Sequence, residues 1–386
     1  MRDLAWLETR LEQGGWLSMT DAAPPAQLLP SGPGVLFSSG GSSGGRRCCL
    51  QPLQNLDRSA AATAAWLERI GVDPSRTWIF NPLPLDHVSG LMPWWRARAW
   101  GVPHHQLNRA LMKDPSALLQ HCRALLREQA SSALLSLVPT QLARLMGHAD
   151  GLAALAEFQV IWVGGAALPR PLAEQARRAG LRLAPCYGST ETAAMVAALP
   201  PARFLAGEIG CGDPLPDVEF RLADDGALQV RSQRLGLAGW RPEQPERLAP
   251  LVDGSGWWRS ADRASFNPGL QILGRLDLAI LSGGVTVYLD QLESRFKSLI
   301  QANNLSVGAI LLLGVDDAEW GQQLVALIRT SDPSVLDRLQ QLSAAWPVAE
   351  QPRRWLLCSE LAPTDAGKWD RRRWMAWLKR LDLAES

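Results

Sequence analysis

The segment FQVIWVGGAALPRPLAEQARRAGLRLAPCYGSTET, residues 158–192, decides the fold class. Its apolar run at 158–163 predicts a strand that runs into a Gly-Gly pair, and residues 171–179 predict a helix that a glycine ends. A second predicted strand at 181–184 precedes the sequence YGSTET. This order of strand, helix and strand favours parallel strands covered by helices, so we predict an α/β fold.

Alternation of helical and extended segments continues on both sides of this stretch, from residue 55 to about 270. After Gly207 the pattern changes to short strands with Gly-rich turns, which predicts a β subdomain of hairpins. Another set of helices and strands follows Arg275. We therefore predict a large N-terminal domain of α/β sheets plus the β subdomain at 1–275. A smaller, mobile α+β C-terminal domain is predicted at 276–386.

Composition excludes several classes of protein. The 386 residues carry a net charge of only +1, so no general attraction to nucleic acid is expected, and Arg371–Arg373 fit the face of an amphipathic helix. We expect no signal peptide at 1–15 and no membrane span, because the longest apolar run is 307–315. Six cysteines without CxxC spacing indicate neither a zinc site nor a disulfide framework, and they fit the cytoplasm.

The first candidate ligand site is the stretch FSSGGSSGGRR at 37–47. Glycines let backbone N–H groups approach phosphate oxygens, hydroxyls add donors, and two arginines add positive charge. A flexible linker has the same composition. The spacing imitates a P-loop, but Arg46 and Arg47 stand where that motif needs Lys and Ser/Thr, which leaves no hydroxyl for Mg²⁺. We therefore reject a P-loop kinase.

The second candidate site is YGSTET, at the carboxyl end of a predicted strand, where α/β sheets bind ligands. Thr190 has a hydroxyl suited to a phosphate, and Glu191 has a carboxylate suited to Mg²⁺. The structural alternative is a helix N-cap followed by an acid in the first turn.

Two more sites carry single charged groups. Asp262 can accept hydrogen bonds from both hydroxyls of a ribose, and Arg275 can reach sugar or phosphate oxygens. Alternatively, the two residues belong to an exposed turn and form a surface salt bridge. Lys368 lies in a Gly-containing loop near the end of the sequence, where it is either a mobile cation for an anionic ligand or a solvated lysine.

In their order, these segments resemble the motifs of the acyl-CoA synthetase, luciferase and peptide-synthetase adenylation superfamily, from about residue 35 to 373. The resemblance implies an acyl-CoA-synthetase-like fold and an ATP-dependent, AMP-forming enzyme that uses Mg²⁺ and CoA. Arg46 and Arg47 replace the proline and lysine of the family's phosphate loop. Leu289 replaces the proline of the motif SGGxxxYPxxxE, which here ends at Glu293.

The resemblance also implies roles for individual residues. The implied catalytic residues are Lys368, Glu191, Thr190 and His87, with Glu191 also the metal ligand. Tyr187 would pack on adenine and Asp262 would bind ribose. The implied binding residues for the nucleotide and CoA are Ser39, Ser42, Ser43, Gly44, Arg47, Gly165, Ala166, Tyr187, Gly188, Asp262, Arg275, Gly283 and Gly284.

Two segments indicate which carboxylic acid such an enzyme would activate. PLDHVSGL at 84–91 and SLVPTQL at 136–142 resemble the branch of the family that activates 2-succinylbenzoate for menaquinone or phylloquinone synthesis. His87 would then line the acyl pocket, or it is a structural histidine. Activation of another aryl or acyl acid, loading of a carrier protein, and a binding protein without catalysis are alternatives. A homo-oligomer is compatible with the sequence.

The resemblance implies a division of labour between two steps. Lys368 would serve the formation of an acyl-adenylate. Rotation of the C-terminal domain about a hinge at Asp277 would then bring Gly283-Gly284 to the site for attack by the CoA thiol.

Overall fold

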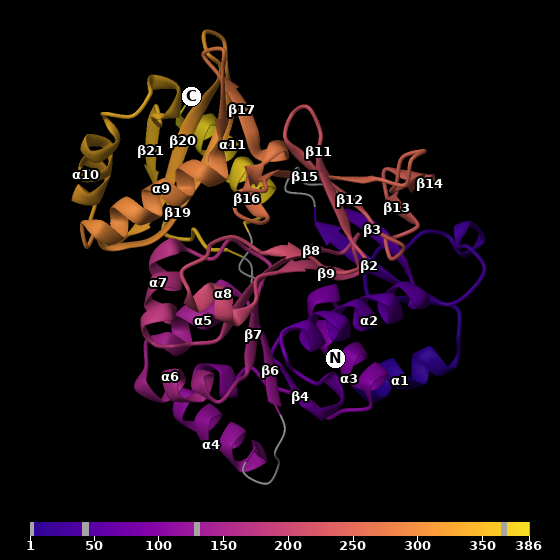
Figure 1. The fold of residues 1–386 in the computed structure, drawn as a ribbon. Helices are drawn as coiled ribbons and strands as arrows, with labels where there is room; N and C mark the ends of the chain where they lie inside the picture. The colour runs from indigo at the N-terminus through magenta and orange to yellow at the C-terminus, as the bar shows by residue number, and fades with distance from the viewer. Residues whose placement is uncertain (1–3, 41–45, 127–131, 364–368, 386) are drawn as a thin grey trace. The chain divides into compact units, whose positions relative to one another are not determined.

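The protein is described by a computed structural model for residues 4–40, 46–126, 132–363 and 369–385. Contacts within that part of the chain divide it into two compact units (Figure 1). The first comprises the described residues up to Ile272 except 261–263; the second comprises 261–263 and the residues from Leu273 onward. The domain boundary after residue 275 and the mobility of the C-terminal part remain predictions.

A seven-stranded sheet forms the centre of the first unit, in the order β10-β9-β8-β7-β6-β4-β5. Strands β5, β4, β6, β7 and β8 are parallel, while β9 and β10 run antiparallel to their neighbours. The strands are β4 (Thr77–Asn81), β5 (His104–Gln106), β6 (Ser132–Leu137), β7 (Val160–Val163), β8 (Leu183–Ser189), β9 (Ala194–Ala198) and β10 (Asp213–Pro214). The helices around them are α2 (Leu53–Arg69), α3 (Val88–Trp100), α4 (Pro115–Leu126), α5 (Pro139–Met146), α6 (Ala149–Ala156), α7 (Arg170–Arg178) and α8 (Pro201–Leu205). The predicted α/β class is confirmed.

Successive side chains of the central strands enter two different cores, because side chains alternate across a strand. Ile79 and Trp162 pack in the core that includes residues of α2 and α3, whereas Phe80 and Ile161 pack in the core shared with α4 to α7. Figure 1 shows these two groups of helices on opposite faces of the sheet. All four residues of β7 are buried, as expected for a parallel strand covered on both faces.

Two smaller antiparallel-rich sheets accompany the central one. Their orders are β1-β2-β3-β13-β14 and β11-β12-β15-β16. Their strands are β1 (Trp16–Ser18), β2 (Gly34–Gly40), β3 (Arg46–Pro52), β11 (Glu219–Leu222), β12 (Ala227–Arg231), β13 (Ala238–Arg241), β14 (Gln244–Pro250), β15 (Trp258–Ser265) and β16 (Gln271–Arg275). The hairpins after Gly207 confirm the β subdomain that the Gly-rich turns predicted.

The second unit is built on one five-stranded sheet with helices on both faces. Its order is β18-β17-β20-β19, with β21 beside β20. Its elements are β17 (Ala279–Ser282), β18 (Val285–Tyr288), α9 (Leu289–Ala302), β19 (Val307–Asp317), β20 (Gly321–Thr330), α10 (Ser334–Ser343), β21 (Arg354–Leu357) and α11 (Arg371–Glu385). Leu312 packs in the core with α9 and α10, while its neighbour Leu311 packs in the core with α11. In the described part of the chain, no helix combines the length and apolar composition that a membrane crossing requires.

Candidate functional site

The turn between β8 and β9 carries Thr190 and Glu191. Because antiparallel pairing with β9 extends β8 to Ser189, Tyr187 and Gly188 lie within a strand. The prediction that this strand ends at residue 184 was wrong, and so was the alternative of a helix N-cap, since a strand follows the turn. Position 188 requires glycine where β8 pairs with β9, because a Cβ there would lie 2.1 Å from the carbonyl oxygen of Ala194.

The backbone of this turn is strained at two alanines. Ala193 and Ala194 have φ values of 50° and 76°, in the left-handed region. For a residue other than glycine this conformation costs about 1–2 kcal/mol. The buried Thr192 hydroxyl donates to the Ala194 carbonyl at 2.6 Å and thereby closes the turn. Such a conformation persists only where the surrounding structure imposes it.

The side chains of Thr190 and Glu191 are available to a ligand. Both residues are partly exposed, and within the described residues neither the hydroxyl nor the carboxylate has a hydrogen-bond or ion-pair partner. Their backbones, in contrast, are held: Gln51 Nε2 donates to the Thr190 carbonyl at 2.7 Å, and the Gly236 N–H donates to the Glu191 carbonyl at 2.8 Å. A fixed backbone with free side chains suits a binding turn at the edge of an α/β sheet.

A metal at this turn would depend on few protein ligands. The described residues contain no group of three or more His, Cys, Asp or Glu that could hold a metal ion. Mg²⁺ in nucleotide sites usually takes one or two carboxylates and completes its coordination with phosphate and water oxygens. An unpaired Glu191 carboxylate fits Mg²⁺ bound in that way.

The cysteines near the turn are not nucleophiles. Burial, followed by the charge of Glu191, raises the pKa of Cys49 well above its usual value, and burial raises the pKa of Cys48 and of Cys186 to about 12. The other three thiols, Cys122, Cys211 and Cys358, have raised pKa values through burial as well. All six cysteines are free. They therefore remain protonated at neutral pH, and covalent catalysis through a thiolate is not expected.

The predicted phosphate loop lies between β2 and β3. Ser42, Ser43 and Gly44 lie outside the described residues, so the structure describes only the strands on either side. Ser39 of β2 is buried and pairs with Arg47 of β3, which is exposed. The Gln51 bond to Thr190 attaches β3 to the turn that carries Glu191.

The predicted adenine-side residues follow the parallel strands. Gly165 and Ala166 lie two and three positions after the end of β7 and are exposed, and Gly165 has a left-handed φ of 79°. Tyr187 is partly buried in the neighbouring strand β8. Because β7 and β8 are parallel neighbours, both groups belong to the carboxyl edge of the sheet, where such sheets bind ligands.

Helix α3 provides one residue that the sequence predicted and one that it did not. His87 is the N-cap of α3, and its side chain is exposed. Gly90 allows the first turn to pack closely, because a Cβ there would lie 1.9 Å from the Pro84 carbonyl oxygen. Arg96 is only 4% exposed and lies over the ring of Trp162, 5.2 Å from its centroid. Its neighbour Arg98 has the same side chain and is exposed, so the sequence carries no signal that marks Arg96 as the buried arginine.

Arg96 is a buried cation without an acidic partner. Its Nε has no hydrogen-bond partner, and no carboxylate of the described residues forms an ion pair with it. Burial lowers the pKa of Arg96 to about 10; the Cys186 side chain opposes this shift, and the charge of Arg234 adds to it. Arg96 is still protonated at neutral pH. A buried cation of this kind is costly unless an anion completes it.

The second unit holds the predicted ribose-side residues. Arg275 forms two hydrogen bonds to Asp277, both of 2.8 Å, and its Nη1 lies 3.6 Å from Asp262 Oδ1. The Arg275 N–H donates to Asp290 Oδ2 at 2.8 Å. The predicted hinge residue therefore pairs with the arginine beside it.

Gly283 and Gly284 form the two-residue turn of the hairpin β17–β18. Both have left-handed φ values, 56° and 79°, as this type of turn requires. Gly283 is further constrained, because a Cβ would lie 2.7 Å from the ring of Trp320.

The end of the second unit contains a buried ion pair. Arg371, at the start of α11, forms a bidentate pair with Glu293 of α9. The backbone N–H of Leu312 in β19 donates to the Glu293 carboxylate, and its carbonyl accepts from Arg371. Lys368 lies outside the described residues, three positions before this arginine.

Within the first unit, the structure thus joins Thr190, Glu191 and the strand that leaves the predicted phosphate loop. Asp262 and Arg275 are joined within the second unit.

Comparison with known proteins identifies the family. The family model described as "AMP-binding enzyme" matches residues 5–235. The chain belongs to this family. Among its relatives is the 2-succinylbenzoate–CoA ligase of Salmonella typhimurium, 31% identical over 310 residues, which cover 79% of this chain and 61% of the relative.

Solved structures of similar proteins agree in fold. Wild-type E. coli MenE with a bound phenylether-linked analogue of OSB-AMS is 28% identical, with a TM-score of 0.62 over 90% of this chain and 69% of that one. The o-succinylbenzoate CoA synthetase MenE of Bacillus subtilis, in complex with ATP and magnesium ion, is 22% identical, with a TM-score of 0.69 over 88% of this chain and 69% of that one. The chain spans about three fifths of the length of the Salmonella relative.

Proposed function

We propose that this AMP-binding enzyme is an AMP-forming acid–CoA ligase that activates 2-succinylbenzoate in menaquinone or phylloquinone synthesis. The observation that carries the proposal is the turn after β8, where Thr190 and Glu191 offer free side chains on a fixed backbone. Relatives named 2-succinylbenzoate–CoA ligase support the substrate. The free thiols are in keeping with a cytoplasmic location, which we also propose.

The chemistry begins with a poor electrophile. A carboxylate has no good leaving group, so the acid's oxygen attacks the α-phosphorus of ATP, pyrophosphate departs, and an acyl-adenylate forms. An anion must approach a polyanion, which makes positive charge at the reacting centre the main requirement. Mg²⁺ held by Glu191 would neutralise phosphate charge. Arg47 and Lys368 would add cations, and the Thr190 hydroxyl would donate to a phosphate oxygen.

The acid has a second, unreactive carboxylate that also needs a partner. Arg96 is a buried cation with an unpaired Nε and no acid beside it within the described residues. We propose that Arg96 binds this distal carboxylate, because the bound anion would supply the negative charge that no described residue provides beside the arginine. His87, exposed at the start of the same helix, would line the mouth of the acyl pocket.

In the second step the CoA thiolate attacks the acyl carbon, the bond to the phosphate oxygen breaks, and AMP leaves. We propose that the C-terminal part rotates about Asp277 between the two steps and brings Gly283-Gly284 to the thiol. Asp262 and Arg275 would bind the ribose. Gly165, Ala166 and Tyr187 would enclose the adenine.

A panel of aromatic and aliphatic acids tests the proposal. With ATP and Mg²⁺, 2-succinylbenzoate should support exchange of pyrophosphate into ATP, and with CoA it should give a soluble thioester and AMP. Succinate and benzoate, which each lack half of the molecule, are the matched controls and should be much poorer. Absence of exchange with every acid would contradict an adenylating enzyme. Exchange without any CoA thioester would indicate loading of a carrier protein instead.

A further inference from the structure

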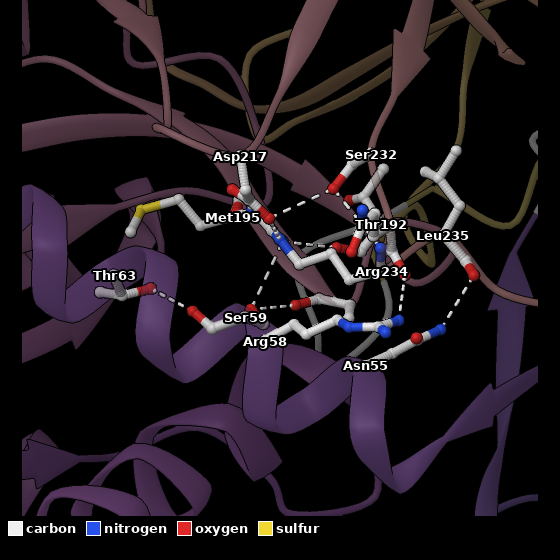
Figure 2. A network of polar contacts seen from close by, with 12 residues as sticks. Asn55, Arg58, Ser59, Thr63, Thr192, Met195, Asp217, Ser232, Arg234 and Leu235 are labelled. Carbon is white, nitrogen blue, oxygen red and sulfur yellow. Dashed lines mark hydrogen bonds and ion pairs between the residues drawn. The ribbon is translucent and has the colours of Figure 1, made fainter. Parts of the chain in front are cut away.

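We propose that Arg234, together with Asp217 and Ser59, is a positioning cluster that fixes the turn of Glu191 and so sets the geometry of Mg²⁺ binding. The inference rests on the proposed function, because it assigns Mg²⁺ to Glu191. None of these three residues belongs to the motifs that predicted the site. Figure 2 shows Arg234 at the centre of the network, between helix α2 and the residues that follow the turn.

Arg234 uses its whole guanidinium group. The residue is completely buried, and its Nε donates to Asp217 Oδ2 at 2.6 Å. Nη1 donates to the Thr192 carbonyl at 2.7 Å, and Nη2 donates to the Met195 carbonyl at 2.8 Å. The planar fork of arginine can serve a carboxylate and two carbonyls at once, which the single ammonium of lysine cannot reproduce in the same geometry.

Ser59 holds the strained part of the turn. Its hydroxyl, buried on helix α2, donates to the Ala193 carbonyl at 2.6 Å, and Arg234 Nη1 lies 3.4 Å from the same hydroxyl oxygen (Figure 2). Ala193 and Ala194 both have left-handed φ values. Two adjacent alanines in this conformation need an external restraint, and the bonds from Ser59 and Arg234 supply it on both sides.

The restraint extends over the whole turn. Six consecutive carbonyls each accept a hydrogen bond, and the donors, in order from Thr190 to Met195, are Gln51 Nε2, Gly236 N, Arg234 Nη1, Ser59 Oγ, Thr192 Oγ1 and Arg234 Nη2. Only the side chains of Thr190 and Glu191 are left without a partner among the described residues. The network therefore fixes the backbone that carries these two side chains and leaves their polar groups available to a ligand.

Two further residues of α2 connect the segment that carries Arg234 to the strand that leaves the predicted phosphate loop. Asn55 Nδ2 donates to Gln51 Oε1 of β3 at 3.0 Å and to the Leu235 carbonyl at 2.9 Å. Arg58 Nη1 donates to the Gln233 carbonyl at 2.7 Å. The segment 233–236 is thus bound directly to α2, and through Asn55 to Gln51 of β3. Displacement of Arg234 would change the placement of Glu191 relative to the strand that carries Arg47.

The deciding experiment compares Ser59→Ala with Thr63→Val. Thr63 is equally buried, lies one turn further along α2 and donates to the Ser59 carbonyl, but among the described residues its hydroxyl forms no hydrogen bond with the turn. Acid-dependent exchange of pyrophosphate into ATP is measured as a function of Mg²⁺, together with the melting temperature. Ser59→Ala should raise the Mg²⁺ concentration for half-maximal rate and lower kcat about tenfold, with an unchanged KM for the acid. Thr63→Val should change only stability.

Arg234→Lys is the stronger variant, with an expected loss of kcat of about 100-fold and a larger shift in Mg²⁺ dependence. If it does not fold, the Ser59→Ala and Thr63→Val pair decides. The inference is overturned if an active wild type and a folded Ser59→Ala share the same Mg²⁺ dependence. A wild type without any acid-dependent exchange overturns the proposed function itself and this inference with it, and that outcome is distinct because it is seen before any variant is made.

Discussion

Two buried arginines of the first unit, Arg96 and Arg234, have opposite surroundings. Arg234 has an acidic partner and donates to two backbone carbonyls, so its charge and its hydrogen-bond donors are satisfied by the protein. Arg96 is almost as deeply buried, yet among the described residues it has no carboxylate partner: the ring of Trp162 lies against its guanidinium and its Nε is unpaired. Since a buried charge without a partner is unfavourable, the difference separates an arginine that maintains the structure from one that is ready for an anionic ligand.

The comparison assumes that neither arginine is the cation at the reacting phosphate, which we assign to Lys368. Lys368→Ala should therefore reduce adenylate formation by about 10²–10³-fold, since it removes a charge that acts in the transition state. Conversion of supplied acyl-AMP to the thioester should be nearly unchanged. Single-turnover assays of the two half-reactions measure both effects. Equal losses in the two steps would contradict the division of labour.

Arg234→Met should lower the free energy of unfolding by about 3 kcal/mol, at the lower end for breaking a buried ion pair because Asp217 is partly exposed and stays solvated. Two carbonyls also lose their donors. Urea denaturation with wild type as reference measures this loss. A stability within about 0.5 kcal/mol of wild type would show that solvent replaces the arginine, and the contrast with Arg96 would fail.

Arg96→Met makes the same change where the protein supplies no partner. The free energy of unfolding should stay the same or rise, because an unpaired buried charge is removed. The KM for 2-succinylbenzoate should increase about 30-fold, equivalent to about 2 kcal/mol, through loss of the bond to the distal carboxylate. An acid without that second carboxylate serves as the control substrate. If both acids are affected equally, Arg96 does not bind the distal carboxylate.

His104 is a third buried basic residue, and unlike the two arginines it can avoid a buried charge by losing its proton. Both ring nitrogens are buried and have no hydrogen-bond partner in the part of the chain that the structure describes; burial, followed by the charge of His105, lowers the pKa of His104 to about 4. The unfolded chain binds this proton near pH 6.5, so stability should fall as the pH decreases from about 6.5 to 4. The expected loss is about 1 kcal/mol, reduced for partial solvation of the ring. Urea denaturation at pH 7 and pH 5 should show a smaller loss for His104→Gln.

The elements that could be predicted are those in which burial produces a recognisable pattern of apolar residues or glycines in the sequence. Continuous apolar runs such as β7 identify strands covered on both faces, and the Gly-rich turns after Gly207 identify hairpins. The end of β8 was missed because it contains Pro185 and Gly188, which disfavour a strand, and pairing with β9 makes it a strand all the same. Thr190 and Glu191 could be proposed because they follow a predicted strand of an α/β sheet, at the edge where such sheets bind ligands, although a helix N-cap was an equal alternative.

Arg96 and Arg234 could not be proposed from the sequence, because burial of an arginine depends on tertiary packing. Arg234 stands in the polar segment RSQRLG and reads as an exposed residue of a loop. Its partners Ser59 and Asp217 are 175 and 17 positions away. Nothing in a single sequence joins these three positions.

The high pKa values of all six native thiols have a practical consequence for spectroscopy. Maleimide and iodoacetamide reagents attack thiolates, so the native chain should be labelled slowly at neutral pH. A cysteine introduced at an exposed position of each unit, such as Leu281→Cys in the second, should then take up a fluorophore almost exclusively. Energy transfer between two such dyes would then report in real time whether the C-terminal unit rotates when nucleotide is added. No natural cysteine would have to be removed.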